Sequence, residues 1–137
     1  MSRGAYERFA HPGNKRVLAK IKSLGFPAIL HICGRTESII DLMADSGAGV
    51  LSIDQIELAK AREIVGKRVC IMGNVRPTET LLGGTPETVR REARKCLADC
   101  MDSPGGYILA TGCEVPIETP RENLMALIEV ARTDGRR

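Results

Sequence analysis

The sequence contains no tryptophan and few other aromatic residues: two tyrosines and two phenylalanines among 137 residues. Proteins that bind single-stranded nucleic acids stack the bases on aromatic side chains, so this scarcity argues against such a function. An excess of one charge is also absent, because 20 Lys and Arg residues stand against 17 Asp and Glu residues and leave a formal net charge of +3. This charge is too small to indicate nucleic acid or an anionic membrane as the partner.

Long hydrophobic runs are missing as well. No apolar stretch approaches the roughly 20 residues that a membrane-spanning helix needs, and residues 1–4 lack the apolar core of a signal peptide. The five cysteines are an odd number, and their scattered positions are not typical of a disulfide framework. We therefore expect a protein of the reducing cytoplasm. With 43% hydrophobic and 27% charged residues, the chain has an ordinary globular composition, and we expect residues 1–137 to form a single domain.

Apolar stretches and helical patterns alternate along the chain. Four short, nearly continuous apolar stretches predict buried strands at residues 28–33, 49–53, 69–72 and 107–111. Helical periodicity predicts helices at residues 38–44, 55–65, 87–101 and 121–132, after an opening helix at 6–24 that is expected to break at Pro12. Four strand–helix units predict a parallel α/β fold, either a small open doubly wound sheet or half of a (β/α)8 barrel.

Two helix starts carry a threonine directly before a proline. Thr85 precedes the helix that starts near Glu87, and Thr119 precedes the last helix, with Glu122 three residues further on. A threonine in this position typically caps the helix with its hydroxyl oxygen. The spacing from Thr119 to Glu122 also predicts a capping box.

Residues that could bind a metal follow the strands of this predicted sheet. His31 and Cys33 are two residues apart at the end of the first strand, so their side chains point to the same side. Cys113 follows the fourth strand. An imidazole and two thiolates suit Zn²⁺, and three protein ligands with one open position are typical of a catalytic zinc site. Polar residues also end the second and third strands: Ser52, Asp54 and Asn74.

Structural roles can explain the same residue types. Cysteine is common in apolar cores, and a histidine near a strand end is often a hydrogen-bonded structural residue. By this argument we expect Cys70, Cys96 and Cys100 to be core thiols. His11, which precedes Pro12, is expected to lie on the surface in a loop.

Four sequence motifs occur together in a characteristic order. They are His31-Ile32-Cys33-Gly34, Gly73-Asn74-Val75, Gly84-Thr85-Pro86-Glu87, and the closing segment from Gly112-Cys113-Glu114-Val115-Pro116 to Thr119-Pro120-Arg121-Glu122-Asn123. In this order they resemble the uroporphyrinogen decarboxylase superfamily, and more narrowly its corrinoid-dependent methyltransferases, such as methylcobamide:coenzyme M methyltransferase. The resemblance starts near Tyr6 and corresponds to the carboxyl-terminal portion of the family. It implies the carboxyl-terminal half of a (β/α)8 barrel, with the four strands as its fifth to eighth.

The resemblance also implies a site and a reaction. Carried over position by position, His31, Cys33 and Cys113 would be the three zinc ligands, and Asp54 would be either a fourth ligand or a residue that supports the ligands. Arg76 stands where the family often has an acidic residue. The implied chemistry is transfer of a methyl group from a methylated corrinoid on a partner protein to a small thiol of the coenzyme M type. The alternatives are uroporphyrinogen decarboxylation and a non-catalytic half-barrel fragment or subunit.

An isolated half-barrel predicts an assembly. It leaves two sheet edges unpaired, at the first and fourth strands, and one apolar sheet face without its opposite wall. That face would carry Leu30, Leu51, Ile71 and Leu109 or their alternating neighbours. We therefore expect the chain to self-associate, with a two-fold dimer that approximates a closed barrel as the simplest form, or to need a separate amino-terminal half.

Overall fold

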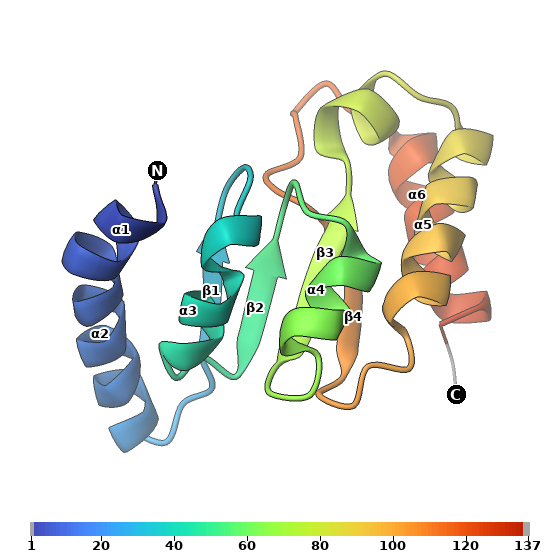
Figure 1. Ribbon diagram of the computed structural model, residues 1–137. Helices are drawn as coiled ribbons and strands as arrows, with labels where there is room; N and C mark the ends of the chain where they lie inside the picture. The colour runs from blue at the N-terminus through green and yellow to red at the C-terminus, as the bar shows by residue number, and fades with distance from the viewer. Residues whose placement is uncertain (1, 136–137) are drawn as a thin grey trace.

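The computed structural model describes residues 2–135, and its strands form one parallel sheet (Figure 1). The strands are β1 (Ile29–Ile32), β2 (Val50–Ile53), β3 (Cys70–Val75) and β4 (Tyr107–Thr111). They lie in the order β1-β2-β3-β4, and every neighbouring pair is parallel. Because this order lacks the reversal of a doubly wound sheet, the four strand–helix units have the arrangement of half a (β/α)8 barrel.

Helices precede β1 and follow each strand. They are α1 (Arg3–Ala5), the π-helical η1 (Tyr6–Ala10), α2 (His11–Ser23), the 3₁₀ helix η2 (Glu37–Ile39), α3 (Ile40–Asp45), α4 (Leu58–Val65), the π-helical η3 (Pro77–Leu82), α5 (Pro86–Cys100) and α6 (Arg121–Thr133). The four predicted strands and the predicted helices are thus confirmed, whereas η3 was missed. Among residues 2–135, no helix combines the length and apolar character that crossing a membrane requires.

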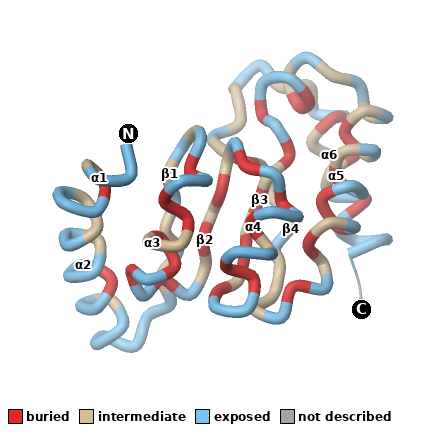
Figure 2. The backbone as a smooth tube through the Cα atoms, viewed as in Figure 1, coloured by how far each residue is buried: buried red, intermediate tan, exposed pale blue. Residues whose placement is uncertain are grey.

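The helices cover one face of the sheet. In Figure 1, α3 and α4 lie in front of the strands, and α5 lies beside α6 at the β4 side. Leu51, Ile53 and Ile71 are fully buried on this covered face, and Figure 2 shows the buried segments concentrated in the central strands and on the helices' inner sides. Alternate residues of the same strands face the other way, where Ile29 and Ile108 are 55% and 42% exposed. The expected bare face is therefore formed by the alternating neighbours of the first-named residues.

The amino-terminal helix differs from its prediction. Residues from Arg3 to Ser23 are helical throughout, so the predicted break at Pro12 is wrong. The His11 N–H bonds to the Tyr6 carbonyl five residues back, and this wider turn accommodates a proline that has no N–H to donate. His11 consequently lies in a helix and not in a loop. Its side chain is only 11% exposed and places Nε2 3.3 Å from Asp45 Oδ2, so the surface prediction is also wrong.

The two predicted caps have different outcomes. Thr85 caps α5 as expected: Thr88 N–H donates to its hydroxyl, and Thr85 N–H donates to the Thr88 hydroxyl. The cap at Thr119 is wrong. Helix α6 begins at Arg121, so Pro120 occupies the capping position and provides no side-chain hydrogen bond. The Thr119 hydroxyl is left buried without a hydrogen-bond partner.

Candidate metal centre

Three potential ligands converge at the carboxyl end of the sheet. His31 is in β1, Cys33 follows β1 directly, and Cys113 follows β4 by two residues. β1 and β4 are the two outer strands of the sheet. The loop after β4, orange in Figure 1, reaches back across the strand ends toward β1 and carries Cys113 to the other two residues.

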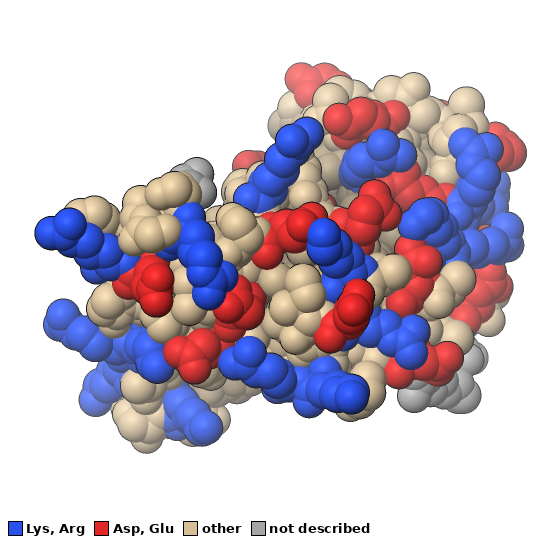
Figure 3. Space-filling view, viewed as in Figure 1, with Lys and Arg blue, Asp and Glu red and all other residues tan. Residues whose placement is uncertain are grey.

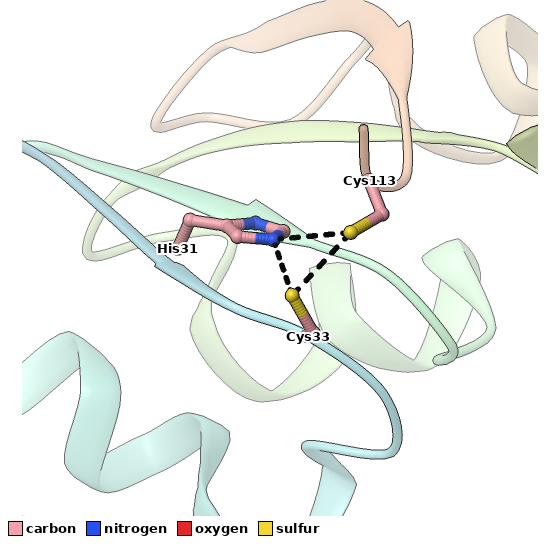
Figure 4. Close-up of side chains that lie close together, drawn as sticks. All are labelled: His31, Cys33 and Cys113. Carbon is pink, nitrogen blue, oxygen red and sulfur yellow. Dashed lines mark hydrogen bonds between the residues drawn. The ribbon is translucent and has the colours of Figure 1, made fainter. Parts of the chain in front are cut away.

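The distances among these side chains are short (Figure 4). His31 Nε2 lies 3.1 Å from Cys33 Sγ and 3.7 Å from Cys113 Sγ, and the two sulfurs are 3.3 Å apart. All three donor atoms lie within 4.8 Å of one another. His31 and Cys33 are exposed and Cys113 is half-buried, so a small molecule has access to the cluster. The sequence-predicted ligands therefore come together in one accessible group.

The imidazole of His31 is held from its other side. Its Nδ1 lies 3.0 Å from the Ser52 hydroxyl oxygen and 3.2 Å from the Ser52 carbonyl oxygen. Ser52 is the residue of β2 that stands opposite His31 in the parallel ladder. Nε2 is consequently the nitrogen that faces the sulfurs. Sequence reasoning gave Ser52 no role beyond a polar strand end, because the register that pairs it with His31 is a property of the folded sheet.

Asp54 lies beside the cluster and outside it. Its Oδ2 accepts a hydrogen bond of 2.7 Å from Gly34 N–H, and its own carbonyl accepts one of 2.8 Å from Asn74 Nδ2. Gly34 has a φ of +79°, a conformation that favours glycine. Asp54 thus fixes the turn that immediately follows Cys33, whereas the group of three donors is formed by His31, Cys33 and Cys113.

The electrostatics of the thiols favour a cation. The hydrogen bond with Cys113 raises the pKa of Cys33 above its usual value, and the charge of Asp54 raises this pKa further. Both effects oppose the thiolate form as long as no positive charge is close. A bound divalent cation acts in the opposite direction and deprotonates coordinating thiols. A bound metal ion would therefore stabilise the thiolate form of these cysteines.

The remaining cysteines lie away from this cluster. Cys96 and Cys100 are buried on α5, as predicted for core thiols, and burial raises the pKa of Cys100 to about 11. Cys70 is half-buried in β3. Buried thiols with raised pKa values are poor nucleophiles and poor ligands at neutral pH.

A separate cleft lies between α5 and the segments at the ends of β1, β2 and β3, and the three donors are not among its lining residues. It has a volume of about 600 Å³ and is lined by Asn74, Arg76, Glu92 and Cys96, among others. Arg76, the position that departs from the resembled family, binds Glu92 here through Nε at 3.1 Å. Figure 3 shows basic and acidic side chains interspersed over this helix-covered side. Several charges around the cleft are engaged in pairs, such as Arg76–Glu92 and Lys95–Asp99.

Comparisons with known proteins agree with this fold. A solved structure, a methyltransferase from Methanosarcina mazei, superposes with a TM-score of 0.86 at 30% sequence identity over 99% of this chain and 39% of that one. Methylcobamide:CoM methyltransferase MtbA of Methanosarcina mazei is 34% identical over 93% of this chain and 36% of its own length. Uroporphyrinogen decarboxylase of Syntrophotalea carbinolica is 29% identical over 94% of this chain and 37% of its own length.

These alignments cover nearly all of this chain but only part of each relative. The chain spans about a third of the length of the curated relatives that it matches. The family model described as uroporphyrinogen decarboxylase (URO-D) matches residues 1–133. This match covers nearly all of the sequence. The chain belongs to the uroporphyrinogen decarboxylase family, an enzyme superfamily that includes methyltransferases and decarboxylases.

Proposed function

We propose that this chain provides the zinc site of an enzyme that transfers a methyl group from a methylated corrinoid to a small thiol. The observation that carries the proposal is the convergence of one imidazole nitrogen and two sulfurs within 4.8 Å of one another. Relatives named methylcobamide:CoM methyltransferases support this donor and acceptor. The thiol would be coenzyme M or a compound of similar kind, and a partner protein would carry the corrinoid.

The three donors fit zinc in kind and number. Catalytic zinc sites use three protein ligands and leave a fourth position for water or substrate. Two thiolates and an imidazole are soft donors, which favour Zn²⁺ over Mg²⁺ or Ca²⁺. When bound, zinc would lower the pKa of a substrate thiol so that its sulfur stays deprotonated at neutral pH.

The chain's own residues would prepare and hold the nucleophile. Cys33 and Cys113 would contribute two negative charges, which keep the neighbouring substrate sulfur electron-rich. His31 would contribute a neutral nitrogen, and Asp54 would support Cys33 through the Gly34 N–H rather than act as a fourth ligand. The substrate thiol proton would leave to solvent, because His31 and Cys33 are exposed.

The methyl transfer would need no oxidant, reductant or other reagent besides the thiolate and the methylated corrinoid. The sulfur lone pair of the substrate thiolate would form the new C–S bond, and the methylated corrinoid of the partner protein would keep the electron pair of its broken Co–CH₃ bond, as Co(I). No general base is needed at the moment of transfer, because the thiol is already deprotonated.

The five free cysteines of the chain suit this chemistry in a reducing compartment, and we place the protein in the cytoplasm.

Metal analysis of single variants tests the zinc assignment. The wild-type chain is expected to bind close to one zinc per assembled site, and Cys33→Ser or Cys113→Ser should lose most of it. Cys70→Ser and Cys96→Ser are matched controls, because they make the same exchange at thiols outside the cluster. Equal zinc content in all four variants would overturn the assignment.

Uroporphyrinogen decarboxylation is the second candidate, because decarboxylases are among the relatives at 29 to 33% identity. Decarboxylation without a cofactor would not require two thiols and an imidazole in contact. The protein with a complete barrel is expected to convert methylcobalamin and a small thiol to a thioether, and a chelator should abolish this activity. Decarboxylation of uroporphyrinogen that survives chelation would favour the second candidate, and zinc binding without either activity would favour a non-catalytic half-barrel.

We further propose that the bare sheet face and the two outer strands are covered in the active assembly. Ile29 and Ile108 are exposed on this face, and β1 and β4 each lack one neighbour within residues 2–135. Unpaired strand edges and exposed apolar faces promote association. A second copy would supply four more strands, and so would a separate amino-terminal half.

A further inference from the structure

We infer that Ser52 is a positioning residue that fixes the imidazole of His31 with its proton on Nδ1, so that the lone pair of Nε2 faces Cys33 and Cys113. This inference deepens the proposed zinc function and rests on it for the role of the lone pair. The orientation of the ring follows from its hydrogen-bond contacts and does not depend on a bound metal.

The two oxygens of Ser52 together favour a proton on Nδ1 of His31. His31 Nδ1 lies 3.2 Å from this oxygen and 3.0 Å from the Ser52 hydroxyl oxygen. A carbonyl oxygen can only accept, so its contact with Nδ1 is a hydrogen bond only when Nδ1 carries the proton, and the hydroxyl oxygen can accept from the same N–H. In the neutral ring the other nitrogen, Nε2, then carries a lone pair. Nε2 is the atom at 3.1 Å from Cys33 Sγ.

The ladder register makes this contact specific to Ser52. His31 and Ser52 are directly paired between β1 and β2, and both belong to the uncovered face of the sheet. The flanking residues of β2, Leu51 and Ile53, are fully buried on the covered face and cannot reach the ring. A shift of β2 by one residue would therefore place a leucine or isoleucine opposite His31.

An orienting partner is important here because, apart from Ser52, the ring of His31 has only the contacts of Nε2 with two cysteine sulfurs. The residue is exposed and lies on an outer strand, so little packing restrains its ring. Imidazole ligands of metals are commonly held by a hydrogen bond from the other ring nitrogen, and loss of such a partner weakens metal binding by about 10- to 100-fold. With the Ser52 carbonyl still in place, Ser52→Ala is expected to weaken zinc binding by about 10-fold, the lower end of that range.

Zinc titration of four proteins tests the inference. We expect Ser52→Ala to bind zinc more weakly than wild type, and Ser52→Thr, which restores a hydroxyl, to recover wild-type affinity. Ser23→Ala is the matched control, since it removes a serine hydroxyl from the end of α2, outside the donor cluster. Unchanged affinity in Ser52→Ala would overturn the role of Ser52. Failure of the wild-type chain to bind zinc would instead overturn the proposed function.

Ring-nitrogen NMR of the metal-free chain provides a readout that a merely structural residue would not change. The sequence has two histidines, so a His11→Gln variant assigns the His31 signals. Neutral His31 is expected in the Nδ1–H form in the wild type, with a larger fraction of Nε2–H in Ser52→Ala at unchanged thermal stability. A wild-type ring that is mainly Nε2–H would contradict the inference regardless of whether zinc binds.

Discussion

The two faces of the sheet differ in what they contribute, although they are made by alternate residues of the same strands. On the covered face Leu51 and Ile71 are fully buried against helices. On the uncovered face, Ile29 is 55% exposed, and His31 and Ser52 form the contact that orients the candidate ligand. The strand period of two thus separates stability from chemistry. Residues that hold the fold and residues that hold the ligand are adjacent in sequence and face opposite ways.

The largest predicted effect is on the free energy of unfolding, and it tests whether the two faces of the sheet really differ. Leu51→Ala removes a fully buried side chain and should lower the free energy of unfolding by about 2–5 kcal/mol. Ile29→Ala makes a similar exchange at a largely exposed position and should change it by about 0.5 kcal/mol when both are measured at a protein concentration at which the chain is monomeric. Urea unfolding followed by circular dichroism measures both. Equal losses would mean that the uncovered face is itself packed in solution.

The oligomeric state tests whether the uncovered face of the sheet promotes association. Light scattering at micromolar concentration is expected to show a dimer or a larger species, because an apolar face and two strand edges are free to associate. Ile108→Lys adds a charge to this face and should shift the population toward monomer, with little change in the unfolding free energy of the monomer itself. A well-dispersed wild-type monomer would contradict the expected association.

The amino-terminal helix restricts the form of such an assembly. α2 precedes β1, so it is an additional helix beyond those that follow the four strands. In a two-fold barrel, α2 of one copy and α6 of the other would lie at the same junction between β1 and β4. Exposed apolar residues also accumulate around α2, namely Phe9, Val17, Leu24 and Phe26. A closed two-fold dimer therefore requires α2 to move, whereas an amino-terminal half with one helix fewer does not.

Buried charge on the covered side should have the next largest effect. Burial alone would raise the pKa of Glu92, but hydrogen bonds from Arg76 and Thr80 outweigh it and lower this pKa. Arg76→Met would leave the carboxylate, only 16% exposed, without its cationic partner. We expect a loss of about 1–3 kcal/mol at neutral pH.

The pH dependence gives the control for this pair. A carboxyl group with a lowered pKa in the folded state stabilises the protein above its unfolded-state pKa, and this contribution is lost as the pH falls through the folded-state value. The difference between wild type and Arg76→Met should therefore shrink in acid. A difference that persists at low pH would indicate lost packing of the arginine stem instead of lost charge pairing.

The sequence predicted the elements well where the local pattern is complete. The limits of β4 match the apolar run at 107–111. The spacing of two residues between His31 and Cys33 predicted that their side chains meet, and they lie 3.1 Å apart. The end of β3 was placed too early, because Gly73 and Asn74 interrupt the apolar run, although both pair with β4. Helix η3 was missed because hydrophobic periodicity is tuned to 3.6 residues per turn and a π-helix departs from it.

The site was predictable to a lesser depth. Cys113 lies 80 residues from Cys33, and only the rule that strand ends meet, together with the resemblance, brought them together. The role of Ser52 depends on which residue of β2 stands opposite His31, and the bracing by Asp54 depends on where its carboxylate meets Gly34 N–H. Both are contacts between segments, which local sequence patterns do not encode.

The two threonines that precede the helix starts, Thr85 and Thr119, provide a smaller test. Thr85→Ala removes a hydroxyl that accepts a hydrogen bond at the start of α5 and should reduce stability by about 1 kcal/mol. Thr119→Val replaces a buried hydroxyl that has no partner by a methyl group of similar size and should leave stability unchanged or raise it slightly. Thermal unfolding of both variants measures the contrast. A loss at Thr119 equal to that at Thr85 would mean that the Thr119 hydroxyl is hydrogen-bonded in solution.

The smallest effect on stability is expected at a solvent-exposed ion pair among the helices. Like Arg76–Glu92 it joins residues of the helix-covered side, so a comparison of the two pairs isolates the effect of burial. Arg3 binds Asp41 through two hydrogen bonds of 2.6 and 2.7 Å, and this contact lowers the pKa of Asp41. Both side chains are more than a third exposed, so water and salt screen most of the attraction. Asp41→Asn should therefore shift the urea midpoint slightly at neutral pH and low salt, and less as the pH falls through the lowered pKa of Asp41, because the wild-type carboxylate then also loses its charge. Comparison with Lys60→Met, which breaks the exposed pair with Glu37, calibrates the size of the effect. A shift as large as that of Arg76→Met would show that exposure does not distinguish the two pairs.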